Sequence, residues 1–185
     1  MAFTESNMLE LGTKAPDFQL PDTVSGKSVS IDDIAGEQGT VVMFLCNHCP
    51  YVIHVNPEIV RVAKEYQAKG IGFVGISSND VAKYPDDAPD RMKEVAKNVG
   101  YSFPYLYDES QEVARAYDAA CTPDFYVFDQ NRLLVYRGRL DASRPGNNEQ
   151  LTGKDLRTAL DAVLAGEEVG DQQYPSAGCN IKWKM

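Results

Sequence analysis

Apolar residues along this chain gather in short continuous runs. Residues 41–45 and 71–76 are such runs, too short for core helices, and each predicts a strand that is buried on both faces. Residues 124–128 and 132–136 flank the turn-forming tripeptide Asp-Gln-Asn, which is typical of a β-hairpin. Residues 103–107 indicate a further strand. Together these runs predict a sheet of several strands.

The segments between these runs show helical spacing of their apolar residues. Residues 56–58 (Asn-Pro-Glu) combine an N-cap, a first-turn proline and an acidic residue, and they predict a helix that ends at Gly70. Alternatively, Pro57 kinks one longer helix that begins at the cysteines of residues 46–49. Further helices are predicted over residues 91–99, 109–117 and 156–165. The alternation of strands and helices predicts an α/β fold with a mixed central sheet, in a single domain over residues 1–185.

Composition and charge restrict the function classes. The chain is 43% hydrophobic and 24% charged, which favours a globular protein over a disordered one. Its net charge of −9 and the lack of a basic stripe argue against nucleic-acid binding. No apolar run approaches the roughly 20 residues that a membrane-spanning helix needs. The first ten residues lack the features of a secretory signal, so we expect a cytoplasmic protein.

The four cysteines point to redox chemistry or metal binding, because they are too few for a disulfide-stabilised secreted domain of this size. Cys46 and Cys49 form a Cys-x-x-Cys motif directly after the strand at residues 41–45, and this spacing would bring both sulfurs into the first turn of a helix. The amides and dipole of that helix N-terminus, with a protonated His48, are expected to lower the pKa of Cys46 but not that of Cys49. Since the thiolate is the nucleophile in disulfide exchange, the motif predicts a redox-active dithiol.

Zinc binding and simple burial are the other interpretations of this motif. Half of a zinc ribbon has the same spacing, and Cys121, Cys179, His48 or His54 could complete the ligand set, although a second paired half is missing. Cysteine is also among the most buried residue types, so both thiols could be core residues. The strand and helix around the motif favour the redox interpretation, for which we expect no metal and no cofactor.

A second feature lies far downstream, where Thr122 and Pro123 precede the strand at residues 124–128, an unusual place for a proline. With the Cys-x-x-Cys motif, this arrangement resembles the thioredoxin fold. More closely, the chain resembles the thioredoxin-like branch of the alkyl hydroperoxide reductase/thiol-specific antioxidant (AhpC/TSA, peroxiredoxin-like) superfamily. The similarity extends over about residues 9–165, and the matching segments are residues 11–20, 103–108, 113–117, 122–123 and 125–129.

The resemblance implies a thioredoxin-like fold with flanking helices, an N-terminal extension and a C-terminal tail over residues 166–185. It implies that Pro123 is cis, faces the motif and, with Thr122, shapes the groove where a partner disulfide docks. Cys46 is then the attacking thiol and Cys49 the resolving thiol of a thiol–disulfide oxidoreductase. Its expected partners are protein or small-molecule disulfides and thiols, with electron exchange to thioredoxin or glutathione, and neither nucleic acid nor a membrane.

Two departures from the family pattern keep an alternative open. Peroxiredoxins carry Pro-x-x-x-Thr/Ser-x-x-Cys, whereas Val42 and Cys46 occupy the Pro and Thr positions before Cys49. A peroxiredoxin-like thiol peroxidase is therefore the second candidate function, and a non-catalytic zinc-binding module is the third. Thioredoxins also carry a buried acid on the strand before the motif. Residues 41–45 contain no acid, which leaves His54 as a weak candidate for the base that deprotonates Cys49.

The remaining two cysteines form a second candidate redox pair. Pro123 would place Cys121 beside the motif, and the extended tail after Gly166 is long enough to bring Cys179 there, so we predict a Cys121–Cys179 disulfide. Ile181 and Trp183, in the same tail, are expected to anchor it on the core.

The polar segment over residues 78–90 carries several acidic side chains. Their spacing fits no EF-hand, so we expect a solvated loop rather than a calcium site. The residues concerned are Asn79, Asp80, Asp86, Asp87 and Asp90.

Overall fold

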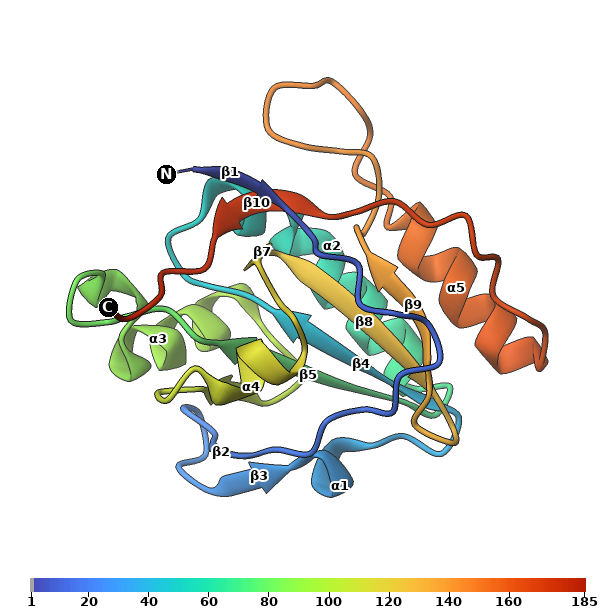
Figure 1. Ribbon diagram of the computed structural model, residues 1–185, viewed down its shortest axis with the longest axis horizontal. Coiled ribbons are helices and arrows are strands. Elements are labelled where there is room, and N and C mark those ends of the chain that lie inside the picture. The colour runs from blue at the N-terminus through green and yellow to red at the C-terminus, as the bar shows by residue number, and fades with distance from the viewer. Residues whose placement is uncertain (1) are drawn as a thin grey trace.

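A five-stranded mixed sheet forms the centre of the protein in the computed structural model, which describes residues 2–185 (Figure 1). Its strands, in spatial order, are β6 (Tyr105–Tyr107), β5 (Ile71–Ser77), β4 (Gly39–Phe44), β8 (Asp124–Asp129) and β9 (Leu134–Gly138). The central strand β4 pairs parallel with β5 and antiparallel with β8. All five predicted strands and the mixed sheet are confirmed, although β6 and β9 begin later than predicted.

Both faces of this sheet are covered, which explains why β4 is a continuous apolar run. The covering elements are α2 (Pro50–Gln67), α3 (Pro89–Val99) and α5 (Lys154–Ala165) on one face, and α1 (Ile31–Ile34), α4 (Glu112–Ala116), β2 (Gln19–Pro21) and β3 (Ser28–Ser30) on the other. Val41 and Met43 belong to the core under α2, α3 and α5. Val42 and Phe44 belong to the opposite core, so successive β4 residues serve alternate faces.

Helix α2 begins at Pro50, with Cys49 as its N-cap, and continues through Pro57. The predicted start at Asn56 is therefore wrong, and the alternative of one longer helix is correct, although this helix begins just after the cysteines. Pro57 is tolerated because it lies on the exposed side, where water can bond the carbonyl group that its missing N–H leaves free. Within residues 2–185, neither α2 nor any other helix combines the length and apolar character needed to cross a bilayer.

The two ends of the chain lie side by side in a second sheet (Figure 1). Its strands, all antiparallel, are β1 (Phe3–Glu5), β10 (Ala177–Asn180) and β7 (Cys121–Thr122), in that order. Beyond β10, Ile181 is buried, and the Arg115 guanidinium lies 4.9 Å from the ring centroid of Trp183. Ile181 therefore anchors the tail on the core as expected, whereas Trp183 is 36% exposed and is not part of the core. The tail also forms a strand, which its sequence does not predict.

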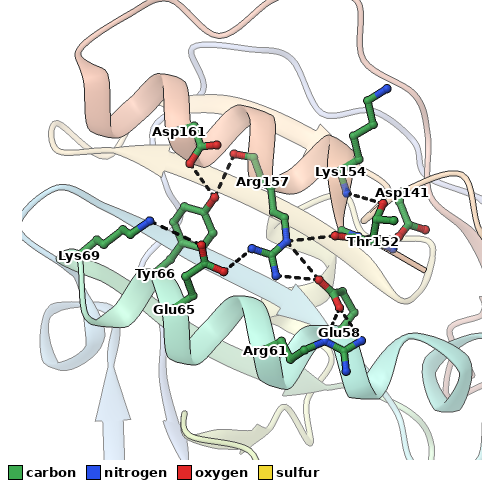
Figure 2. Close-up of polar contacts among 11 residues, drawn as sticks. Glu58, Arg61, Glu65, Tyr66, Lys69, Asp141, Thr152, Lys154, Arg157 and Asp161 are labelled. Carbon is green, nitrogen blue, oxygen red and sulfur yellow. Dashed lines mark hydrogen bonds and ion pairs between the residues drawn. The ribbon is translucent and has the colours of Figure 1, made fainter. Parts of the chain in front are cut away.

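Ion pairs around one buried carboxylate join helices α2 and α5 (Figure 2). The side chain of Glu58, on α2, is only 5% exposed and accepts hydrogen bonds from Arg157 of α5 at 2.8 Å and from Arg61 at 2.6 Å. Arg157 also bonds Glu65, farther along α2. Arg157 therefore supplies the link between the two helices at this carboxylate.

Replacing Arg157 with alanine is expected to lower the free energy of unfolding by about 2–3 kcal/mol, because Glu58 would keep a buried charge with one partner fewer. Arg61 is the matched control. Its side chain is 58% exposed, so its replacement should cost at most about 1 kcal/mol. Urea unfolding of both variants measures the difference. Equal losses would show that the buried carboxylate is not what makes Arg157 important.

Candidate active site

The Cys-x-x-Cys motif lies at the carboxyl end of β4, where the chain enters α2. Both of its cysteines are buried, with 1% exposure for Cys46 and 0% for Cys49. Thr122, from β7, contacts both of them. Its Oγ1 lies 3.3 Å from Cys46 Sγ, and its carbonyl oxygen lies 3.5 Å from Cys49 Sγ. The two sulfurs therefore share one neighbour that is distant in the sequence.

The peptide bond between Thr122 and Pro123 is cis, as the family resemblance implies. The residue that follows, Asp124, pairs with Phe44 of β4, and this register brings β7 to the motif. The two residues predicted to shape the docking groove, Thr122 and Pro123, have different surroundings in the structure. Thr122 is covered by β10, whereas Pro123 lines a pocket of about 210 Å³ with Tyr51 and other residues.

Asp87, in the short 3-10 helix η1 (Pro85–Asp87), is the charged group that the structure places at the motif. It is fully buried, and its carboxylate accepts hydrogen bonds from the backbone N–H groups of Asn47 (2.8 Å) and His48 (3.3 Å) and from the Asn79 side chain (2.8 Å). His48 Nδ1 lies 2.6 Å from the same carboxylate. The geometry is not that of a hydrogen bond, but the two groups form an ion pair when His48 is protonated. The expectation of a solvated loop is therefore wrong for Asn79, Asp80 and Asp87, all of which are buried.

This arrangement reverses the expected acidity of the two cysteines. Helix α2 starts only at Pro50, so its N-terminus lies at Cys49, while Asp87 occupies the amides next to Cys46. A hydrogen bond from the Cys46 thiol to Cys49, then burial and the charge of Asp87, raise the pKa of Cys46 well above its ordinary value. The same bond, followed by a weaker one from Cys179, lowers the pKa of Cys49 to about 5, despite burial. The geometry therefore favours the thiolate on Cys49 rather than on Cys46, the opposite of the expectation from the sequence.

Replacing Asp87 with asparagine is expected to lower the pKa of Cys46, because the amide keeps an acceptor oxygen for Asn47 but removes the negative charge. In a chain that retains Cys46 as its only cysteine, the alkylation rate should therefore rise at lower pH. Asp86 is the matched control, since it bonds Asn47 through its carbonyl group and its side chain is exposed. An unchanged Cys46 profile would mean that Asp87 only positions the loop.

Strand β10 brings a third cysteine to the motif. Cys179 Sγ lies 2.6 Å from Cys49 Sγ. In the sheet register Cys179 is opposite Thr122, and Asn180 is opposite Cys121. Because successive residues of a strand point to opposite faces, the side chains of Cys121 and Cys179 point apart. The tail reaches the motif as predicted, but the structure does not bring these two cysteines together.

Two other titratable groups lie away from the thiols. His54 Nε2 is 3.1 Å from Ser143 Oγ, a partner outside the motif. Asp124 is a buried acid on β8, the strand next to β4, and it accepts a hydrogen bond from Ser6. It is opposite Phe44 in the sheet register, on the face of the sheet away from the motif. The structure therefore gives no support to His54 as a base for Cys49.

Three residues of the site could hold a metal ion. The ligand atoms of Cys46, His48 and Asp87 lie within 4.8 Å of one another, and no other group of three or more such residues occurs within residues 2–185. This is not the predicted zinc set, because Cys49 and Cys179 are outside it. Structural zinc sites almost always have four protein ligands, so this group lacks one.

The fold and the site define the class of protein. A mixed sheet between helices, with a Cys-x-x-Cys motif at the end of β4 beside a cis-proline, is a thioredoxin-like fold. The thioredoxin domain of a thiol-disulfide oxidoreductase from Bacteroides vulgatus has this fold, with a TM-score of 0.60 and 19% identity over 74% of this chain and 90% of that domain.

Residues 11–137 match the AhpC/TSA family, and the chain belongs to that family. It is similar to the thiol-disulfide oxidoreductase ResA of Bacillus thuringiensis subsp. konkukian, with 22% identity over 72% of each chain. It is also similar to an uncharacterized conserved protein from Geobacillus kaustophilus. That crystal structure is 55% identical, has a TM-score of 0.98, and is matched over 100% of this chain and 97% of its own.

Proposed function

We propose that this protein is a thiol–disulfide oxidoreductase that cycles Cys46 and Cys49 between a dithiol and a disulfide. The observation that carries the proposal is the contact of both sulfurs with Thr122, next to the cis bond, where β4 meets α2. The similarity to ResA, which is named for this activity, supports the same reaction class.

In this proposal Cys46 attacks and Cys49 resolves. The Cys46 thiol gives its proton to the Cys49 thiolate as the Cys46 sulfur attacks a substrate disulfide and releases one substrate thiolate. Cys49 then passes that proton to the released substrate thiolate and attacks the Cys46 sulfur of the mixed disulfide. The second substrate thiolate leaves, and the Cys46–Cys49 bond closes. Cys49 thus serves in this proposal as both proton acceptor and resolving thiol.

Because both sulfurs are buried, a substrate reaches them only when the covering segments move. We propose protein or small-molecule disulfides as substrates, thioredoxin or glutathione as the electron partner, and the cytoplasm as the compartment. The direction of electron flow follows from the reduction potential of the Cys46–Cys49 pair relative to the glutathione pool.

The test is equilibration of the purified protein with glutathione redox buffers, followed by mapping of the Cys46–Cys49 bridge. We expect a reversible bridge with a single potential, and thiol-dependent turnover of a disulfide substrate. Consumption of hydrogen peroxide faster than of disulfides would instead favour a thiol peroxidase, which the residues Val42 and Cys46 in place of Pro and Thr argue against. Stoichiometric zinc in the protein, with no bridge formed, would favour the zinc-binding module.

A further inference from the structure

We propose that Cys179 is a third redox-active cysteine, which exchanges with the Cys46–Cys49 disulfide to form a Cys49–Cys179 disulfide. The proposal rests on the proposed function for its starting disulfide. The two sulfurs lie 2.6 Å apart, and a disulfide bond is about 2.05 Å long, so a small movement joins them. Cys49 would then be the sulfur common to two alternative bridges.

The sheet register fixes Cys179 at this place. Strand β10 is paired on both sides, so that Cys179 lies between Phe3 of β1 and Thr122 of β7. The neighbouring Gly178 permits this approach, since a Cβ atom there would lie 2.0 Å from the Thr122 carbonyl oxygen. Cys179 is also buried, with 3% exposure. It is therefore held as a buried partner of Cys49.

The exchange needs no external oxidant. The Cys179 thiolate attacks the Cys49 sulfur, the Cys49–Cys179 bond forms, the Cys46–Cys49 bond breaks, and Cys46 leaves as a thiolate that takes up the proton lost by Cys179. One disulfide is present before and after. In the reduced protein, burial and then the hydrogen bond to Cys49 raise the pKa of Cys179 to about 12. That hydrogen bond and the Cys49 charge disappear when Cys49 enters a disulfide, so Cys179 becomes more acidic when exchange is possible.

The exchange would also move the disulfide away from Asp87 and toward a pocket that Cys179 lines. Cys46 lies beside the buried Asp87, whereas Cys179 lines a pocket of about 210 Å³ together with Ala2, Phe3, Pro50, Tyr51 and Gly178. A small thiol that enters this pocket attacks the Cys179 sulfur, forms a mixed disulfide with it and releases the Cys49 thiolate. Oxidation at Cys46 and reduction at Cys179 would then use different approaches.

The experiment uses the full chain with Cys46 replaced by serine, which removes the first bridge and leaves Cys49 and Cys179. Oxidised glutathione forms a mixed disulfide with Cys49, and attack by Cys179 then releases the bound glutathione. Trypsin separates the cysteines, because Cys49 lies in peptide 28–61, Cys121 in 116–132 and Cys179 in 158–182. Under non-reducing conditions we expect peptide 28–61 linked to peptide 158–182, with Cys121 alkylated.

Three variants complete the test. C46S/C179S should retain glutathione on Cys49, with its release slowed roughly tenfold or more because the intramolecular attack is lost. C46S/C121S should form the same bridge as C46S, because Cys121 takes no part in the exchange. C46A controls for any effect of the serine side chain itself on packing at position 46. Glutathione retained on Cys49 and an alkylated Cys179 in both C46S and C46A would overturn the inference. Absence of a bridge within peptide 28–61 of C179S, in which the exchange cannot occur and both Cys46 and Cys49 are retained, would instead overturn the proposed function, so the two failures are distinguishable.

Discussion

Serine in place of Cys49 is expected to abolish thiol–disulfide turnover, with a loss of roughly 100-fold or more, because the resolving nucleophile is removed. The same change removes the Cys49 thiolate, whose hydrogen bond with the Cys46 thiol is the largest cause of the raised pKa of Cys46. Cys46 should therefore still attack, and the variant should accumulate a mixed disulfide between Cys46 and the substrate. Turnover of a small disulfide, together with the intact mass of the protein after the reaction, measures both effects.

Cys121 provides the matched control for this prediction. Its thiol contacts the carbonyl groups of Pro123 and Ser176, and a serine hydroxyl can make the same contacts. C121S should therefore retain turnover within about twofold, since the exchanging sulfurs are untouched. A C49S variant that is as active as C121S would show that Cys46 acts alone and that the dithiol mechanism is wrong.

Asparagine in place of Asp124 is expected to remove a large pH dependence of stability. Burial, only partly opposed by hydrogen bonds from Ser6 and Tyr126, raises the pKa of this carboxyl from 3.8 to about 7. Between about pH 4 and pH 7 the folded protein holds a proton that the unfolded chain has released. The free energy of unfolding therefore falls as pH rises, by about 1.4 kcal/mol per unit and about 4 kcal/mol in total, and is constant above pH 7.

Urea unfolding at several pH values between 4 and 8 tests this expectation. Other carboxyl groups contribute their own pH dependence, so the informative quantity is the difference between the unmodified protein and D124N. That difference should shift in favour of D124N as pH rises, whereas D171N, at an exposed position, should show no such trend. Parallel stability curves for the unmodified protein and D124N would mean that Asp124 is already ionised in the folded state at pH 4.

The sequence predicts well those elements of the fold that depend on a few consecutive residues. The apolar run of β4 is buried on both faces, and this is visible from five consecutive residues. Pro57 misled the prediction of the helix start, because an N-cap, a proline and an acid in succession are typical of a first helical turn. In α2 the burial of Val55 and Ile59 on either side of Pro57 instead keeps one continuous helix.

In the site, too, the sequence identifies residues by local pattern but not the contacts between distant segments. Cys46 and Cys49 are recognisable by spacing, and Thr122 with Pro123 by a proline ahead of a strand. The sequence around Asp87 predicts a solvated loop, because nothing in it shows that η1 folds back onto the motif. The partner of Cys179 depends on which strand face it occupies, and a shift of one residue in register would exchange its place with that of a neighbour. Long-range register is not encoded in any local pattern.

The pairing of β1 with β10 has a consequence for the order of folding. Phe3 and Cys179 are opposite each other although nearly the whole chain separates them, so closing this loop carries a large entropic cost before any contact compensates for it. The central sheet, with its shorter connections, is expected to form first. A Cys46–Cys49 bridge spans two residues and can close on a partly folded chain. A bridge between Cys49 and Cys179 can close only after the two chain ends have met, and would therefore mark molecules that have finished folding.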